Sequence, residues 1–218
     1  MNSAGVPNVI AVIIALAAVA LLPLIVVTMT SFLKISVVMF IVRNALGIQQ
    51  TPPNIVLYSI ALVLTVYISS PMIGDIYGRL TERPVDLYTI EGLSSAAQTV
   101  KEPVQANLMR FTNPKERQFF INATSKVWPE NARGQLRESD MAILLPAFVS
   151  SELTRAFEIG FLLYLPFLVI DLIVANILIS MGMIMVSPTL MSVPLKLLLF
   201  VAVDGWARLM HGLILSYA

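Results

Sequence analysis

The chain has 218 residues, of which 57% are apolar and only 12% charged, and its mean hydropathy is +0.84. A typical soluble domain has about 25% charged residues, so this composition is that of a membrane protein. The net charge of +1 gives no indication of nucleic acid as a partner. With no cysteine and a single histidine, His211, the sequence excludes disulfides, thiolate catalysis and a histidine-rich metal site within one chain, and we expect no cofactor.

Charged residues are concentrated in the middle of the chain. Residues 1–33 have none, whereas residues 75–140 contain 18 of the 27 charged residues, nine acidic and nine basic. We therefore predict an apolar helical hairpin over 1–74, a polar and mostly helical lobe over 75–140, and a second apolar helical hairpin over 141–218. Within the lobe, "KEP" at 101–103 and "NPKER" at 113–117 are turn or helix-start signals.

The first predicted membrane span covers Val9–Leu33, which is 25 uncharged residues and long enough to cross about 30 Å of hydrocarbon. We expect Pro23 to kink it. A cleaved signal peptide is the alternative, because residues 15–20 (ALAAVA) are small. The missing basic segment before them and the apolar sequence after Ala20 favour an uncleaved span.

The second predicted span covers Asn54–Gly74 and is interrupted near its end by Pro71. The connection over 34–54 contains Lys34 and Arg43 and no acidic residue. By the positive-inside rule this connection is cytoplasmic. The N-terminus and the lobe over 75–140 would then lie on the opposite side of the membrane.

The last third of the chain is apolar but contains seven charged residues, namely Glu152, Arg155, Glu158, Asp171, Lys196, Asp204 and Arg208. An isolated charge that faces lipid costs at least ~2.5–3.5 kcal/mol. We therefore expect these side chains to form ion pairs between helices or subunits, or to line an aqueous cavity.

Two subsets of these charges have their own predictions. Glu152, Arg155 and Glu158 are three residues apart, so neighbours pair along one side of a helix. A structural ion-pair stripe is preferred, and a hydrated wall or proton relay is the alternative. Asp171 is expected to pair with Lys196 or Arg208 of a neighbouring helix or chain, because buried charges are usually paired.

Three methionines, Met181, Met183 and Met185, occupy alternate positions, with Gly182 between the first two and Pro188 after the last. On a helix, residues two apart point in different directions, whereas in an irregular loop they share a face. We expect Gly182 and Pro188 to break the helix here. The residues alone leave open whether the methionines fill gaps in a packed core or line a loop.

Three blocks of sequence resemble one known family. They read "VRNALGIQQTPPN" at 42–54, "LLPAFVSSELTRAFEIGFLLYLPFLVIDL" at 144–172 and "SVPLKLLLFVAVDGW" at 192–206. The chain is similar to the SctR/FliP export-gate proteins of type III secretion, and its sequence motifs are more similar to those of the injectisome (SctR) branch. Val42 stands where leucine is usual, and the resemblance does not rest on residues 75–140. The family motif residues are Arg43, Asn44, Gly47, Gln49, Gln50, Pro52 and Pro53.

The resemblance implies a structural subunit without enzymatic activity in the bacterial inner membrane, with the 75–140 lobe on the periplasmic side. It implies a helical cone-shaped oligomer of five copies with SctS-like two-helix subunits and an SctT-like subunit. SctU-like and SctV-like export components, membrane lipid and unfolded secretion substrates would be further partners, and nucleic acid would not.

The resemblance also favours the loop hypothesis for the methionines. Copies around one axis would point Met181, Met183 and Met185 inward as a compliant gasket, because methionine is flexible and an apolar constriction excludes ions by dewetting. The polar groups of the 42–54 motif would make hydrogen bonds between helices or subunits, and Pro52 with Pro53 would discourage a continuous helix.

Other functions remain as alternatives. A small-solute channel or secondary transporter would have its site at the broken helices around 182–194, but the two apolar halves show no internal repeat. An assembly scaffold is a third possibility. An intramembrane protease would need paired aspartates, and only Asp171 with Asp204 is available, without a protease motif.

Overall fold

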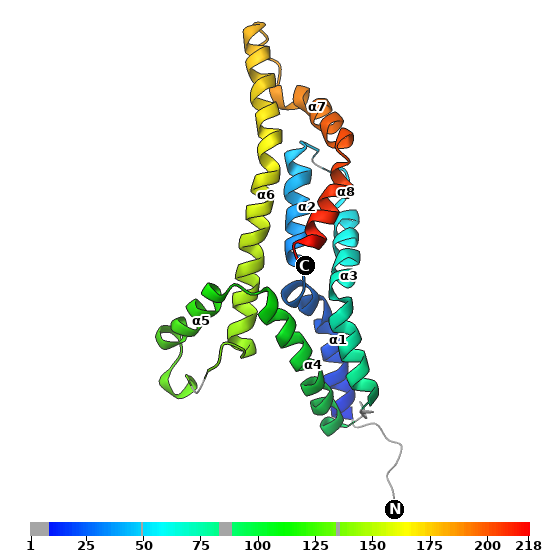
Figure 1. The fold of residues 1–218 in the computed structure, drawn as a ribbon, viewed down its shortest axis with the longest axis vertical. Coiled ribbons are helices and arrows are strands. Elements are labelled where there is room, and N and C mark those ends of the chain that lie inside the picture. The colour runs from blue at the N-terminus through cyan, green and yellow to red at the C-terminus, as the bar shows by residue number, and fades with distance from the viewer. Residues whose placement is uncertain (1–8, 49, 83–88, 134–135) are drawn as a thin grey trace, which may run out of the picture. The chain divides into compact units, whose positions relative to one another are not determined.

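The computed structural model describes residues 9–48, 50–82, 89–133 and 136–218, and every regular element in these ranges is helical (Figure 1). The predicted all-α class is therefore confirmed. The helices are α1 (Val9–Met29), α2 (Phe32–Ala45), α3 (Asn54–Glu82), α4 (Ile90–Phe111), α5 (Pro114–Val127), the short 3₁₀ helix η1 (Glu130–Ala132), α6 (Met141–Ser180), α7 (Pro188–Ala202) and α8 (Gly205–Leu215).

Several helices are suited to a membrane. By length and composition α3 and α6 are each able to cross one, and the number in the described residues rises to four if the bent pairs α1–α2 and α7–α8 each count as one span. The 40 residues of α6 give a length of about 60 Å, roughly twice the hydrocarbon thickness. A single straight crossing of the bilayer therefore leaves part of α6 outside the hydrocarbon.

The predicted first span is wrong at its end. The helix stops at Met29 and a new helix starts at Phe32, so Val9–Leu33 is not one element. The hydroxyls of Thr28 and Thr30 donate to backbone carbonyls four residues earlier, and this side-chain bonding competes with the regular helix and bends it.

Prolines end fewer helices than the sequence predicts. Pro71 lies inside α3, which continues to Glu82 instead of ending near Gly74. Pro23 lies inside α1, and the kink expected there stays a prediction. The "KEP" signal is also wrong, because Pro103 lies inside α4. A proline removes one backbone hydrogen bond, and the other bonds of these long helices are enough to carry each helix through it.

The described residues within 1–31 and 69–151 form one compact unit. Its core is formed by Leu108 of α4 with Leu144 and Phe148 of α6. The "NPKER" prediction is confirmed, since Asn113 caps α5 by accepting a hydrogen bond from the Lys115 N–H and Pro114 is the first residue of the helix.

The described residues within 32–68 and 152–218 form a second compact unit. Its core is built around α2, whose Ile35, Val38 and Met39 are fully buried, and it includes Leu209 and Leu213 of α8. Figure 1 shows α7 turning back from the end of α6 and α8 lying beside α2. The three-part division over 1–74, 75–140 and 141–218 rests on composition and stays a prediction.

Close packing of α2 and α6 requires a glycine. A Cβ added to Gly160 of α6 would collide with the Ile41 Cδ1 atom and lie 3.1 Å from its Cγ2. We expect Gly160→Val to destabilise the protein by about 1–3 kcal/mol, because the two helices would be forced apart. Thermal unfolding of the purified protein in detergent measures this.

Two further variants control this experiment. Ile41→Ala combined with Gly160→Val should recover part of the lost stability, because it removes the atoms that collide. Gly78→Ala should be neutral or slightly stabilising, since a Cβ at Gly78 meets no atom within 4 Å. Equal unfolding temperatures for Gly160→Val and the unmodified chain would contradict the contact.

Candidate functional site

The loop between α6 and α7, residues 181–187, is called the methionine loop below. Helix α6 ends in a Schellman motif: the Gly182 N–H donates to the Ile179 carbonyl at 3.0 Å and the Met183 N–H to the Leu178 carbonyl at 2.9 Å. Gly182 has φ +75°, in the left-handed region that favours glycine. Glycine therefore ends α6 at this point.

Proline defines the other end of the methionine loop. Pro188 is the first residue of α7, where its missing N–H removes no helical hydrogen bond. The two predicted helix breakers thus bound the segment that carries the three methionines. In this segment the helical geometry that would separate alternate side chains does not apply.

Apolar side chains of the methionine loop are exposed in the single chain. The exposed fractions are 67% for Met181, 39% for Met183 and 101% for Met185, and Ile184 is also largely exposed. A contiguous exposed apolar patch of this kind marks a contact surface. Within the described residues these methionines do not belong to a packed core.

An ion pair between a buried lysine and a partly buried aspartate closes the α6–α7 hairpin below the methionine loop. The Lys196 Nζ of α7 lies 2.6 Å from Oδ2 of Asp171 on α6, and the Ser192 hydroxyl donates to Oδ1 of the same carboxylate at 2.5 Å. Lys196 also donates to the Ala45 carbonyl at the end of α2, at 3.0 Å. One ammonium group therefore joins α2, α6 and α7.

The end of α2 is shaped to receive α7. Gly47 has φ +78° and its N–H donates to the Asn44 carbonyl at 3.0 Å, which turns the chain after the helix. A Cβ at Gly47 would lie 2.7 Å from Cγ2 of Val193 on α7. This glycine of the 42–54 motif is thus needed both for its backbone conformation and for close approach of α7.

Arg43 joins the end of α2 to the start of α3. Its Nη1 atom donates to the Asn54 Oδ1 at 2.6 Å and to the Pro52 carbonyl at 3.2 Å, and its guanidinium lies 4.9 Å from the centre of the Phe40 ring. The Nε atom is buried without a hydrogen-bond partner. Arg43 therefore holds Pro52 and Asn54 against the end of α2 from inside the unit.

The other polar residues of the motif differ in position. Asn44 and Gln50 are exposed, and Gln49 lies outside the described residues. The Pro53 carbonyl accepts the Val56 N–H at 3.0 Å, so this proline leads directly into α3. Hydrogen bonds of Asn44, Gln49 and Gln50 to other subunits stay predictions.

A second buried charge cluster joins α2, α6 and the segment after α8. The Lys34 Nζ lies 3.8 Å from Glu152 Oε2 and 3.4 Å from the centre of the Tyr217 ring, and the Tyr217 hydroxyl donates to the same Glu152 oxygen. Burial, followed by the charge of Glu152, raises the pKa of Tyr217, so the phenol stays protonated and donates. Lys34 and Glu152 have almost no exposed side-chain surface.

The remaining predicted charges divide into two groups. Arg155 Nη1 lies 3.7 Å from Glu152 Oε1, as the i, i+3 spacing predicts. Glu158, Asp204 and Arg208 are exposed, and no ion pair between described residues includes them. Contacts of these three with other subunits stay predictions.

Sequence reasoning did not find the partners Lys34 and Tyr217. Lys34 was assigned only an orienting role, and Tyr217 no role at all. The available signal was a lysine two residues into an otherwise apolar helix, a position that needs a buried carboxylate or a ring face.

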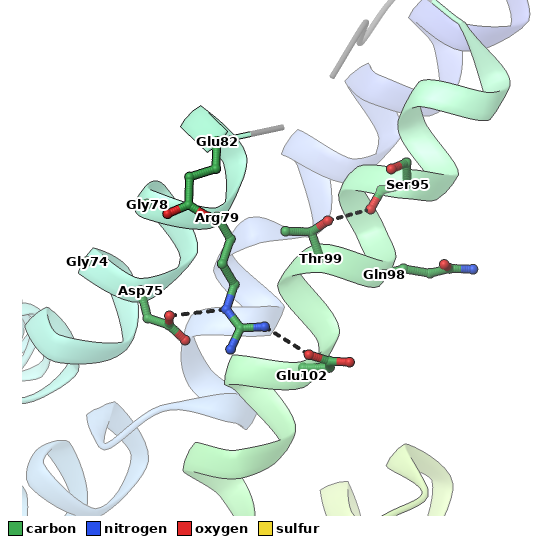
Figure 2. Close-up of a pocket in the computed structure, with 9 residues that line it drawn as sticks. All are labelled: Gly74, Asp75, Gly78, Arg79, Glu82, Ser95, Gln98, Thr99 and Glu102. Carbon is green, nitrogen blue, oxygen red and sulfur yellow. Dashed lines mark hydrogen bonds and ion pairs between the residues drawn. The ribbon is translucent and has the colours of Figure 1, made fainter. Parts of the chain in front are cut away.

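A polar cleft of about 800 Å³ lies in the first unit between α3 and α4 (Figure 2). Arg79 bridges its two walls, with Nε 3.1 Å from Asp75 Oδ1 and Nη1 2.8 Å from Glu102 Oε2. No group of three or more metal-ligating side chains suited to an ion occurs among the described residues. The cleft is therefore a solvated ion-pair surface without evident chemistry.

Together these features define an all-helical membrane protein whose C-terminal hairpin exposes an apolar loop above a buried ion pair. Residues 15–213 match the FliP family, and the chain belongs to this family.

Three relatives match almost the whole chain. It is 54% identical over 211 residues to "Probable translocation protein y4yL" of Sinorhizobium fredii, covering 97% of this chain and 95% of the relative. It is 47% identical over 211 residues to "Yop proteins translocation protein R" of Yersinia pestis, covering 97% of each. It is 44% identical over 204 residues to "Virulence protein YscR" of Salmonella typhimurium, covering 91% of this chain and 92% of the relative. The predicted SctR/FliP family and its injectisome branch are confirmed.

The Lys196–Asp171 pair generates a stability prediction. Lys196→Met should lower the free energy of unfolding by about 3 kcal/mol, because it leaves the Asp171 carboxylate without its cation in a largely buried site. The double variant Asp171→Asn with Lys196→Met should recover most of this loss, since no unpaired charge remains. Thermal unfolding of the purified protein measures both.

Surface ion pairs provide the matched control. Arg79→Gln removes two ion pairs, each exposed on both sides, and should leave the unfolding temperature unchanged. If Arg79→Gln lowered the unfolding temperature as much as Lys196→Met, burial would not be the reason for the effect.

Proposed function

We propose that this protein is a structural, pore-forming subunit of a type III secretion export gate, through which unfolded proteins cross the bacterial inner membrane. The proposal assigns it no enzymatic activity. The observation that carries it is the methionine loop, whose flexible apolar side chains are exposed at the tip of a hairpin with a rigid base. The names of the relatives, which refer to translocation and virulence, support the process.

The hairpin combines a fixed base with a deformable tip. Asp171 lies nine residues before the end of α6, which is about 14 Å along the helix axis. The buried pair to Lys196 holds the hairpin together at this level, while Met181, Met183 and Met185 lie beyond it without helical constraint. A gate needs both parts, because the ion-paired base of the hairpin must keep its structure while the methionine loop changes conformation.

Methionine suits the seal for physical reasons. An opening that passes a polypeptide must be about 10 Å wide, the diameter of a helix with side chains, and an open channel of that width leaks ions. Methionine has three rotatable bonds and a polarizable sulfur, so side chains from several copies close against one another and then adapt to varied cargo. The apolar lining excludes ions by dewetting while no cargo is present.

The apolar surface of the chain supports an oligomer. Large apolar side chains such as Phe157, Phe161 and Leu162 on α6 and Val63 and Tyr67 on α3 are more than half exposed. Lipid and neighbouring subunits would cover them. The proposed assembly is a helical cone of five copies with SctS-like and SctT-like subunits, served by SctU-like and SctV-like components, with the 75–140 lobe on the periplasmic side.

The transporter alternative is less well supported. A coupling site at the broken helices would need an accessible carboxylate, whereas Asp171 is held by Lys196 and Ser192. A scaffold would tolerate any change in the methionine loop, and this separates it from a gate.

Replacing Met181, Met183 and Met185 together with alanine should raise ion leakage through the assembled complex while assembly itself is intact. The physical reason is that a methyl group is too short to close the constriction. Conductance of the purified complex in a planar lipid bilayer measures the leak, and Met191→Ala is the matched control because Met191 is half-exposed but lies outside the loop. Unchanged conductance in the triple variant would argue for a scaffold.

The mass of the purified assembly tests the oligomer separately. Native mass spectrometry should find five copies of this chain together with the two-helix and larger partner subunits. A monomer or dimer with full activity would contradict the gate and favour a transporter.

A further inference from the structure

An apolar groove of about 620 Å³ lies within the second unit, between α6, α7 and α8. Leu163 and Phe167 of α6, Phe200 of α7 and Leu209 of α8 contribute to its walls. Of its 14 lining residues, only Arg208 and Ser216 have polar side-chain groups. The groove is therefore an apolar surface with one cationic side chain, that of Arg208.

Arg208 has no counter-ion in the part of the chain that the structure describes. Its side chain is exposed, and neither an ion pair nor a side-chain hydrogen bond to it occurs there. Asp204, four residues earlier, is also exposed and lies beyond ion-pair distance of it. A guanidinium beside an apolar surface is complementary to a phosphate attached to hydrocarbon, because its planar fork binds phosphate oxygens in a bidentate manner.

The size of the groove favours a flexible chain over a helix. A helix about 10 Å wide that rises 1.5 Å per residue fills a volume of 620 Å³ with only roughly five residues. That is too little to seat a membrane helix of about 20 residues. Helices α7 and α8 also have exposed apolar side chains, among them Leu198 and Leu215, where lipid chains would be neighbours.

We propose that this groove binds an anionic phospholipid, with an acyl chain against α6 and α8 and the phosphate held by Arg208. The site is independent of the methionine loop and goes beyond the proposed gate function. The lipid would fill space that this chain leaves open and would neutralise a cation that it leaves unpaired.

Two variants separate the acyl and phosphate parts of the site. Arg208→Gln removes the cation, and Gly212→Leu fills the groove from α8, where an added Cβ meets no atom within 4 Å. Lys126→Gln is the matched control, because Lys126 is an exposed cation on α5 that does not line the groove. None of these residues belongs to the methionine loop or its supporting ion pair.

The experiment is native mass spectrometry of the full purified complex, titrated with phosphatidylglycerol or phosphatidylcholine in detergent. The unmodified complex should prefer phosphatidylglycerol about tenfold, a ratio typical of one charge-assisted hydrogen-bonded contact. Arg208→Gln should abolish the preference, Gly212→Leu should weaken binding of both lipids about tenfold, and Lys126→Gln should change neither. A preference that survives Arg208→Gln, or lipid binding that survives Gly212→Leu, would overturn the proposal.

A second measurement needs no variant and so does not depend on folding of the substituted chains. Phosphatidylglycerol with a photoreactive acyl chain should cross-link to peptides of α8 and of residues 159–167 in the unmodified complex. Cross-links confined to other helices would overturn the site. In a separate experiment that does use a variant, a photoreactive residue in place of Leu209 would also overturn the site if it cross-linked only to a partner protein, because a protein would then occupy the groove.

Discussion

An ammonium group without access to water governs the arrangement of the C-terminal helices. Lys196 is charged and buried, so its N–H groups need acceptors at fixed positions, and it finds them in the Asp171 carboxylate and the Ala45 carbonyl. Those acceptors belong to α6 and α2, and only one placement of α7 satisfies both. The close approach at Gly47 and the direction in which the α6–α7 hairpin presents its loop follow from that placement. In an apolar environment, a charge of this kind determines structure more strictly than hydrophobic contact, which has no direction.

The charges of this chain divide into two kinds with different consequences. Lys34, Glu152, Asp171 and Lys196 are neutralised within one chain, where one pair joins α2 to α6 and the other joins α6 to α7. Glu158, Asp204 and Arg208 are exposed, on a surface that is otherwise apolar. The first kind holds the subunit together before it meets any partner. The second kind is available to whatever surrounds the subunit, whether another protein or lipid.

Local signals in the sequence were reliable where a single residue decides the backbone. Gly182, Pro188 and Asn113 each act through their own conformation or cap, and each lies where the sequence predicts a helix end. Two prolines were misleading, since Pro71 and Pro103 lie inside helices whose remaining hydrogen bonds outweigh the one that is lost. Asp171 was correctly limited to two possible cations, but the choice of Lys196 depends on packing. The pairing of Glu152 with Lys34 and Tyr217 could not be predicted from the sequence, because only the tertiary fold brings these residues together.

The Schellman motif at the end of α6 has a consequence for any polypeptide that passes the methionine loop. The backbone N–H groups of Met181, Gly182, Met183 and Val186 all donate to carbonyls of their own chain. An extended strand gains adhesion by adding itself to unpaired backbone groups, as in β-augmentation. These four N–H groups are already hydrogen-bonded within the chain. A passing strand would therefore contact the flexible methionine side chains and find few free main-chain donors for hydrogen bonds. In the proposed gate, such a lining would bind every sequence equally weakly, so cargo of any composition would pass without being retained.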